Sequence, residues 1–350
     1  FKGFKKLPAI SVLRSFSAPV SLKTDLSKEQ LAELIALDTD SVNRYESARE
    51  LVIDEIKSIY LKNAAGPSEI IIRAYQKLIS DPSTDPMLKS EIMTLPGVDT
   101  ICSELPHHDA VGVYHARELF LNRLASALRS ELDHVWQHRQ AVPYRPEPDQ
   151  MSDRAFTNAC LTYLTRASRE VYEEQAFNHF IKADNMTNRI AAYGILCRYA
   201  GPLCEKATQQ YRDRFGQDQL AMDKWFAVQM GMSQVPDLNL VQKLASDSLF
   251  DLKNPNRVRA LLGSFARNVI TFHLKDGSGY EYLAKHLIEI DRFNPSIAAR
   301  LATLFDKTQK LLPEAKARSV EILTRVIRQN SPSNDLSEII NKVLQCDQTK

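Results

Sequence analysis

Apolar residues recur every three or four positions along almost the whole chain, starting near Asp25. This spacing is the period of an α-helix with one buried face. Strand-like patterns do not separate the helical segments, which excludes a parallel α/β sheet. The predicted helices, after a first one that contains Leu31, Leu34 and Ile35, cover 41–61, 68–80, 86–94, 109–140, 152–168, 170–183, 187–199, 203–215, 218–230, 237–247, 255–270, 280–291, 295–310, 313–329 and 335–345.

Helix pairs of about 40 residues are typical of stacked α-hairpins. We therefore predict an all-α fold, a curved α-superhelix of HEAT/ARM-like helix pairs spanning 25–350. Ser27 and Gln30 have the spacing of a capping box, and Asp85-Pro86 supplies a cap and a first helical residue. Glycine is scarce, with 11 in 350 residues against a usual share of about 7%. A chain so poor in glycine has few tight turns, which also favours long helices.

The first 24 residues have a different character. Segments Phe1–Phe4 and Ala9–Phe16 mix apolar, β-branched and basic residues, and Pro8 and Pro19 interrupt them. This pattern predicts one or two strands, too few to form a sheet alone. Because Phe1 is not a methionine, we expect a piece of a longer or processed protein. We therefore predict a boundary that separates closing strands in 1–24 from the helical domain in 25–350.

Charge and composition limit the function. The net charge is only +2, which argues against a nucleic-acid partner because such a partner needs a concentrated basic surface. Apolar runs stay far below the 18 or so residues of a membrane span, so no membrane association is expected. An odd, scattered set of cysteines predicts free thiols and, by default, a cytoplasmic protein. These cysteines are Cys102, Cys160, Cys197, Cys204 and Cys346.

Histidines offer only weak metal sites. His134 and His138 have the i, i+4 spacing that lets two imidazoles bind one zinc, but Val135 stands where a metalloprotease has its glutamate base. We interpret them as solvated helix histidines. His107, His108, Asp109 and His115 form a looser set near a helix start. We expect no metal ligand in this chain.

Glycines and arginines mark helix starts. Asp276-Gly277-Ser278-Gly279 lacks the remaining residues of either phosphate-binding fingerprint and predicts a turn. Asn254-Pro255 and Asn294-Pro295 each supply a cap and a first helical residue, with Arg257 and Arg259 after the first and Arg300 after the second. These arginines fit either salt bridges on a solvated face or contacts to a peptide's carboxylate or carbonyls.

Five strings together resemble the C-terminal part of the aminopeptidase N family of zinc metallopeptidases, in its bacterial-type alanyl aminopeptidase branch. They occur in the family's order and extend from one end of the chain to the other. They are Ser11-Val12-Leu13-Arg14-Ser15-Phe16-Ser17-Ala18-Pro19-Val20, Asp184-Asn185-Met186-Thr187, Met222-Asp223-Lys224-Trp225-Phe226, Asn254-Pro255-Asn256-Arg257-Val258-Arg259 and Asp276-Gly277-Ser278-Gly279-Tyr280.

The resemblance implies that 1–24 closes a small β-sandwich and that 25–350 is a helical domain capping the active site. In that family the zinc ligands H-E-x-x-H…E and the amine-binding G-x-M-E-N lie upstream, and neither string occurs here. A zinc-bound water, with the motif's glutamate as base, would attack the first peptide bond. The resemblance therefore implies zinc in the parent enzyme, none in this chain, and no activity of this chain alone.

The remaining role that the resemblance implies is control of peptide access. Arg259, Arg300 and Asn256 become candidate cavity-lining residues that contact the C-terminal side of a short peptide. Relatives often have Asn-Pro-Gln where this chain has Asn294-Pro295-Ser296, so a polar contact from that turn is expected to be weaker. The expected partners are the upstream catalytic domain and short peptides. The alternative is a free-standing helical-repeat scaffold that binds protein partners.

Overall fold

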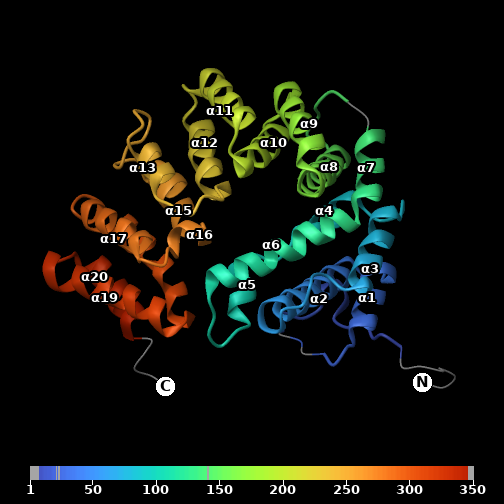
Figure 1. Cartoon of the computed structure of the whole chain (residues 1–350), viewed down its shortest axis with the longest axis horizontal. Coiled ribbons are helices and arrows are strands. Elements are labelled where there is room, and N and C mark those ends of the chain that lie inside the picture. Colours follow the sequence, from blue (N-terminus) through green and yellow to red (C-terminus); the bar gives the residue numbers. More distant parts are fainter. Residues whose placement is uncertain (1–7, 21, 23, 140–141, 346–350) are drawn as a thin grey trace. The chain divides into compact units, whose positions relative to one another are not determined.

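The structure, a computed structural model, describes residues 8–20, 22, 24–139 and 142–345. They form two compact units, each described separately below. Figure 1 labels helices along the chain. The first unit runs to residue 101 and includes 115–189, and the second contains 102–114 and the residues from 190 onward. The boundaries fall within helices α5, α6 and α10. The helices up to the last boundary are α1 (Lys28–Leu37), α2 (Ser41–Lys62), α3 (Glu69–Ser80), α4 (Pro86–Met93), α5 (Val98–Ser103), α6 (Ala110–Ala127), α7 (Arg129–His138), α8 (Pro148–Ala167), α9 (Arg169–Lys182) and α10 (Met186–Tyr199).

The second unit continues with helices only. Its described part includes one turn of π-helix, η2 (Arg259–Gly263), and one 3-10 segment, η3 (Thr303–Lys310). The α-helices are α11 (Pro202–Phe215), α12 (Gln219–Met232), α13 (Asn239–Ala245), α14 (Pro255–Val258), α15 (Ser264–Arg267), α16 (Val269–Phe272), α17 (Ser278–Asp291), α18 (Pro295–Ala302), α19 (Pro313–Asn330) and α20 (Asn334–Gln345).

Helices that follow one another in the chain pack together within each unit. In the first unit α1 contacts α2 and α3, and α8 contacts α7 and α9. In the second unit α11 contacts α12, α17 contacts α18, and α19 contacts α20. No strand occurs in the described residues, where an isolated bridge joins His108 to Leu311. The all-α prediction of stacked helix pairs is therefore confirmed.

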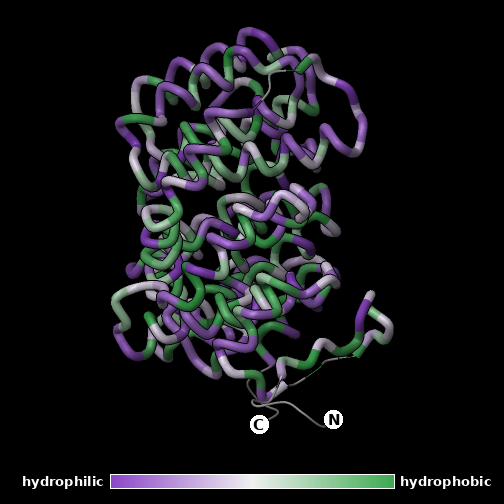
Figure 2. Tube along the Cα trace, turned by 90° about the vertical axis from the view of Figure 1, so that its right-hand side faces the viewer, coloured by the Kyte–Doolittle hydropathy of each residue, from purple (hydrophilic) through white to green (hydrophobic). Residues whose placement is uncertain are grey.

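Local signals set the helix starts as predicted. The Ser27 hydroxyl accepts a hydrogen bond from the backbone amide of Gln30, and the Gln30 side-chain oxygen accepts one from the backbone amide of Ser27. The three apolar residues predicted to share one face of this first helix are all buried. Figure 2 shows hydrophobic and hydrophilic residues interspersed along the helical segments. No helix among the described residues is long and apolar enough to cross a membrane.

Buried cations close the ends of helices in the first unit. Arg44 donates from Nε to the carbonyl of Ile35 at 2.9 Å, near the end of α1. Lys89 donates to the carbonyls of Ile79 at 3.0 Å and Asp81 at 2.7 Å, at the end of α3. The last carbonyls of a helix lack partners within it and carry a partial negative charge, so a cation satisfies both needs. Arg189 likewise donates to the carbonyls of Phe180 and Ala183 at the end of α9.

The structure divides two segments that apolar spacing predicted to be continuous helices. The segment predicted as one helix over 109–140 divides at Leu128, whose ψ is 5°. Leu124, Leu128 and Leu132 are all fully buried, so the apolar spacing continues across the bend and conceals it. The segment 255–270 contains η2 and then breaks at Asn268, whose side chain donates to the carbonyls that end α12, at 2.8 and 3.0 Å.

The described part of the N-terminal segment forms no strand. A single 3-10 turn, η1 (Arg14–Phe16), stands where a strand was expected within Ala9–Phe16, and Phe1–Phe4 lies outside the described residues. Arg14 pairs with Asp38 at 2.8 Å, and the Ser15 amide donates to Asp40 at 2.7 Å. These contacts hold the segment against the turn between α1 and α2. Pairing with an upstream sandwich domain stays a prediction.

Candidate functional site

The two Asn-Pro pairs begin helices as predicted. Asn254 accepts hydrogen bonds from the amides of Asn256 at 3.0 Å and Arg257 at 3.3 Å, at the start of α14. Asn294 accepts one from the amide of Ile297 at 3.2 Å, at the start of α18. In both helices the proline occupies the first turn, where its missing N–H is not needed. The caps fix where each following arginine leaves the backbone.

Arg257 is buried and already paired. The residue is 2% exposed, and its Nη2 donates to Gln219 Oε1 at 2.7 Å. Its Nη1 lies 3.3 Å from Asp223 Oδ1, and its guanidinium lies 5.0 Å from the centre of the Phe226 ring. A cation in the first turn of a helix opposes the helix dipole, and the Asp223 carboxylate offsets this cost. Arg257 is therefore a structural residue that joins α14 to α12.

Arg259 lies two residues later and is half-buried. It is the first residue of the π turn η2, and its guanidinium donates to the side-chain oxygen of Asn256, which is exposed. The structure thus brings together two of the three predicted site residues. Because one nitrogen of the guanidinium is held by a neutral amide, its positive charge stays available for an anionic or carbonyl ligand.

Arg300 lies in the last turn of α18 and is exposed. In the described part of the chain its guanidinium has no hydrogen bond or ion pair. A cation in the last turn is favoured by the helix dipole, so Arg300 needs no carboxylate to be stable there. Helix α18 contacts η2, so Arg300 and Arg259 lie on neighbouring elements of the second unit.

The glycine turn is built for close packing. Gly277 has a φ of 80°, a left-handed conformation that favours glycine. A methyl group at Gly279 would lie 2.3 Å from the carbonyl oxygen of Phe272. The Asp276 carboxylate accepts hydrogen bonds from the Ser278 amide and hydroxyl at 3.0 and 2.7 Å, so these polar groups find their partners within the loop. The predicted turn is therefore present, and Gly279 also allows α17 to pack closely against the backbone of Phe272.

The histidines form no metal centre in the described residues. His134 and His138 are both exposed, and their ring centres lie 4.2 Å apart. His138 Nδ1 is 2.8 Å from the backbone oxygen of His134. Across the described residues, no three His, Cys, Asp or Glu side chains are arranged to hold a metal ion. The geometry agrees with the interpretation of solvated helix histidines.

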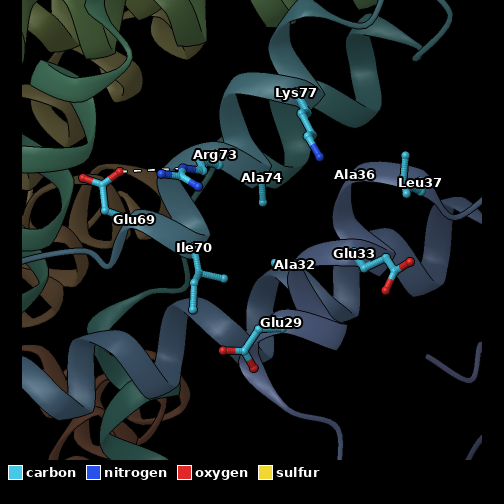
Figure 3. Close-up of a pocket in the computed structure, with 10 residues that line it drawn as sticks. All are labelled: Glu29, Ala32, Glu33, Ala36, Leu37, Glu69, Ile70, Arg73, Ala74 and Lys77. Atoms are coloured by element: carbon cyan, nitrogen blue, oxygen red, sulfur yellow. Dashed lines mark ion pairs between the residues drawn. The ribbon is translucent and has the colours of Figure 1, made fainter. Parts of the chain in front are cut away.

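A groove of about 420 Å³ lies between α1 and α3 in the first unit, and sequence reasoning missed it (Figure 3). Glu29 and Glu33 line the α1 side, and Glu69, Arg73 and Lys77 line the α3 side, where Glu69 pairs with Arg73 at 3.9 Å. Alanines on both helices leave the groove open because their side chains are small, and their i, i+4 spacing in α1 was the only sequence signal. The α1 edge is acidic, which suits a segment with basic residues facing it. The floor residues are Ala32, Ala36, Leu37, Ile70 and Ala74.

Relatives align with nearly the whole chain. Aminopeptidase N of Escherichia coli is 30% identical over 97% of this chain, and that of Caulobacter vibrioides is 31% identical over 96%. Aminopeptidase N of Haemophilus influenzae is 29% identical over 99%. The chain spans only 39–40% of the length of these relatives.

A solved structure and a protein family agree with this alignment. The crystal structure of Legionella pneumophila aminopeptidase A in complex with aspartic acid superposes with a TM-score of 0.85 at 28% identity, covering 95% of this chain and 40% of that one. Residues 28–345 match a family described as a domain of unknown function (DUF3458_C) with ARM repeats. The chain therefore belongs to the DUF3458_C family of ARM-repeat domains and is homologous to the C-terminal helical region of aminopeptidase N.

Proposed function

We propose that this chain is the noncatalytic C-terminal domain of a zinc-dependent aminopeptidase that removes N-terminal residues from peptides. In this role it caps the active-site chamber and limits which peptides enter. The alignment carries the proposal, because proteins named aminopeptidase N match the chain throughout but are more than twice its length. The sequence also contains neither H-E-x-x-H nor G-x-M-E-N.

The residues present do not fit a zinc site. His134 and His138 lack both a third ligand among the described residues and a glutamate at position 135. Zinc, the water that it activates and the general base would therefore belong to the upstream catalytic domain. The contribution of this chain is to bind and orient the part of the peptide that does not react.

Arg300 and Arg259 would hold the C-terminal side of the peptide. A guanidinium binds a carboxylate through two parallel N–H···O bonds, which gives both affinity and orientation. Arg300 is free of competing carboxylates among the described residues, and Asn256 holds Arg259 in place without neutralising it. The π turn that begins at Arg259 supports this assignment, because such turns occur often at functional sites. Short peptides are the expected ligands, and nucleic acid and membranes are not.

The absence of catalytic groups is tested on the chain alone. We expect the purified 350-residue chain to bind no stoichiometric zinc and to leave alanyl-p-nitroanilide intact. Metal analysis measures the bound zinc, and absorbance at a single wavelength measures the hydrolysis of the substrate. Zinc at one equivalent together with turnover would overturn the proposal.

The peptide-binding role is tested in the intact enzyme with Arg300→Ala and Arg259→Ala. Loss of a charge-assisted hydrogen bond should raise KM for a tripeptide about fivefold to tenfold. KM for alanyl-p-nitroanilide, which has no peptide carboxylate, should change less than twofold. Arg328→Ala, which removes the same charge from an exposed position on α19, is the matched control. Equal effects on both substrates would exclude contact with the C-terminal side.

The alternative, a free-standing scaffold for protein partners, rests on the groove between α1 and α3. Its acidic α1 edge would accept a helix with basic residues along the facing side. The coding sequence upstream of Phe1 separates the two proposals. Several hundred residues containing H-E-x-x-H would support the aminopeptidase, and a start codon directly before Phe1 would support the scaffold. A cytoplasmic location stays a prediction under both.

A further inference from the structure

Two cysteines of the second unit lie side by side. The sulfur atoms of Cys197, near the end of α10, and Cys204, in the first turn of α11, are 3.7 Å apart. A two-residue turn, Ala200 and Gly201, separates the two helices. Sequence reasoning missed this pair, because a spacing of seven positions does not match a C-x-x-C motif and a turn separates the two cysteines. The helix–turn–helix hairpin brings them together.

The two thiols have different surroundings. Cys197 is 5% exposed, and burial raises its pKa. Cys204 is only partly buried, and a hydrogen bond with Cys197 lowers its pKa to about 7. The Thr208 hydroxyl lies 3.9 Å from the Cys204 sulfur, and the position in the first turn of α11 also favours a thiolate. One thiol is therefore a nucleophile that solvent reaches, and the other is a buried neighbour.

We propose that Cys197 and Cys204 form a reversible disulfide when the protein meets a hydroperoxide, with Cys204 attacking first and Cys197 resolving. This modification site is separate from the proposed peptide-binding function and does not depend on it. The contact between the sulfurs carries the proposal, since a disulfide needs them about 2.05 Å apart. The required approach of about 1.7 Å from the observed 3.7 Å is small enough for side-chain rotation to supply.

The chemistry proceeds in two balanced steps. The Cys204 thiolate attacks the terminal oxygen of the hydroperoxide, which breaks the O–O bond, forms a sulfenic acid and releases hydroxide or alkoxide. The Cys197 sulfur then attacks the Cys204 sulfur, its proton goes to the departing hydroxyl, and water leaves. Two thiols are oxidised and one hydroperoxide is reduced. A low-molecular-weight dithiol reverses the reaction by exchange.

Other thiols provide internal controls. Cys160 is fully buried, and burial raises its pKa to about 12. Cys102 is 7% exposed. Both are buried, whereas solvent reaches Cys204. A folded protein should therefore lose the thiols of Cys197 and Cys204 to peroxide and keep those of Cys102 and Cys160; Cys346 lies outside the described residues.

The experiment treats the native protein with hydrogen peroxide at low molar excess, labels the remaining thiols after denaturation and maps the labelled peptides. We expect label at Cys102 and Cys160, none at Cys197 and Cys204, and label at all four after dithiothreitol. Trypsin would release residues 190–198 and 199–206 as one disulfide-linked pair of peptides, which mass spectrometry identifies through the loss of two hydrogen atoms. Label at Cys197 and Cys204 after treatment, or a disulfide that joins either of them to a second protein molecule, would overturn the proposal.

Variants test the order of attack. In Cys197→Ser, the sulfenic acid at Cys204 should persist and react with dimedone, because the resolving thiol is absent. In Cys204→Ser, the initial rate of thiol loss should fall at least tenfold. Cys102→Ser should still form the bond and serves as the matched control. Rapid loss of thiols in Cys204→Ser would show that another cysteine reacts first. Peptide mapping of the protein without substitutions needs no variant, so it tests the proposal even if a variant fails to fold.

Discussion

Asn254-Pro255 and Asn294-Pro295 begin two helices of the second unit with the same capping residues. The arginines that follow them, Arg257 and Arg300, lie in different environments. Arg257 lies in the first turn of α14, is 2% exposed, and pairs with Asp223. Arg300 lies in the last turn of α18, is exposed, and has no ion pair among the described residues. The helix dipole disfavours a cation in the first turn and favours one in the last. A cation at the favourable end needs no carboxylate and stays available to a ligand.

The largest effect is expected from removing the buried cation. Arg257→Met would leave the Asp223 carboxylate, 19% exposed, without its partner, and should lower the free energy of unfolding by about 2–4 kcal/mol. Arg300→Met, the matched substitution, should change it by less than about 0.5 kcal/mol. Urea unfolding in a Trp136→Phe background lets Trp225, on α12, report the second unit.

A double variant sharpens this comparison. Arg257→Met combined with Asp223→Leu leaves no unpaired charge, so it should recover part of the lost stability. Equal losses in Arg257→Met and Arg300→Met would contradict the assignment of one arginine to structure and the other to ligand binding.

A middle-sized effect is expected at the caps. Replacing a capping asparagine by alanine should cost about 1 kcal/mol in either helix. Asn254→Ala should cost more than Asn294→Ala, because Asn254 accepts two amides and Asn294 accepts one. The same unfolding assay measures both, with Asn→Asp at each position as the control that keeps the cap. A larger loss for Asn294→Ala would show that the caps differ for another reason.

The smallest effect concerns salt. Raising the ionic strength from about 0.05 M to about 0.5 M screens an exposed cation far more than a buried one. The ratio of tripeptide KM between Arg300→Ala and the unmodified enzyme should therefore shrink by about twofold. The stability loss of Arg257→Met should stay constant. A salt-insensitive KM ratio would argue that Arg300 acts by packing and not by charge.

Sequence patterns predicted the helices best where the signal is local. Ser27 with Gln30 and both Asn-Pro pairs were found because a cap depends on residues within three positions. The bend at Leu128 was missed because the buried leucines keep their spacing across it. The break at Asn268 was missed because its cause is a pair of carbonyls at the end of α12, more than thirty positions away.

The candidate site shows the same division. Arg259, Arg300 and Asn256 were named from the resemblance, and the hydrogen bond between Arg259 and Asn256 links two of them. Spacing alone left every arginine open to a salt bridge or a ligand. The partner of Arg257 lies on another helix, and so does the sulfur that faces Cys204. Neither could be inferred from spacing.

The all-α class and most helix starts could be predicted from the amino-acid sequence, because helical period and capping depend on neighbouring residues. Which charges are neutralised and which stay free depends on how the helices pack. Burial, a carboxylate within reach and the position along the helix dipole are properties of packed elements. For that reason Arg257 is buried, Arg300 is exposed, and the thiols of Cys197 and Cys204 lie next to each other.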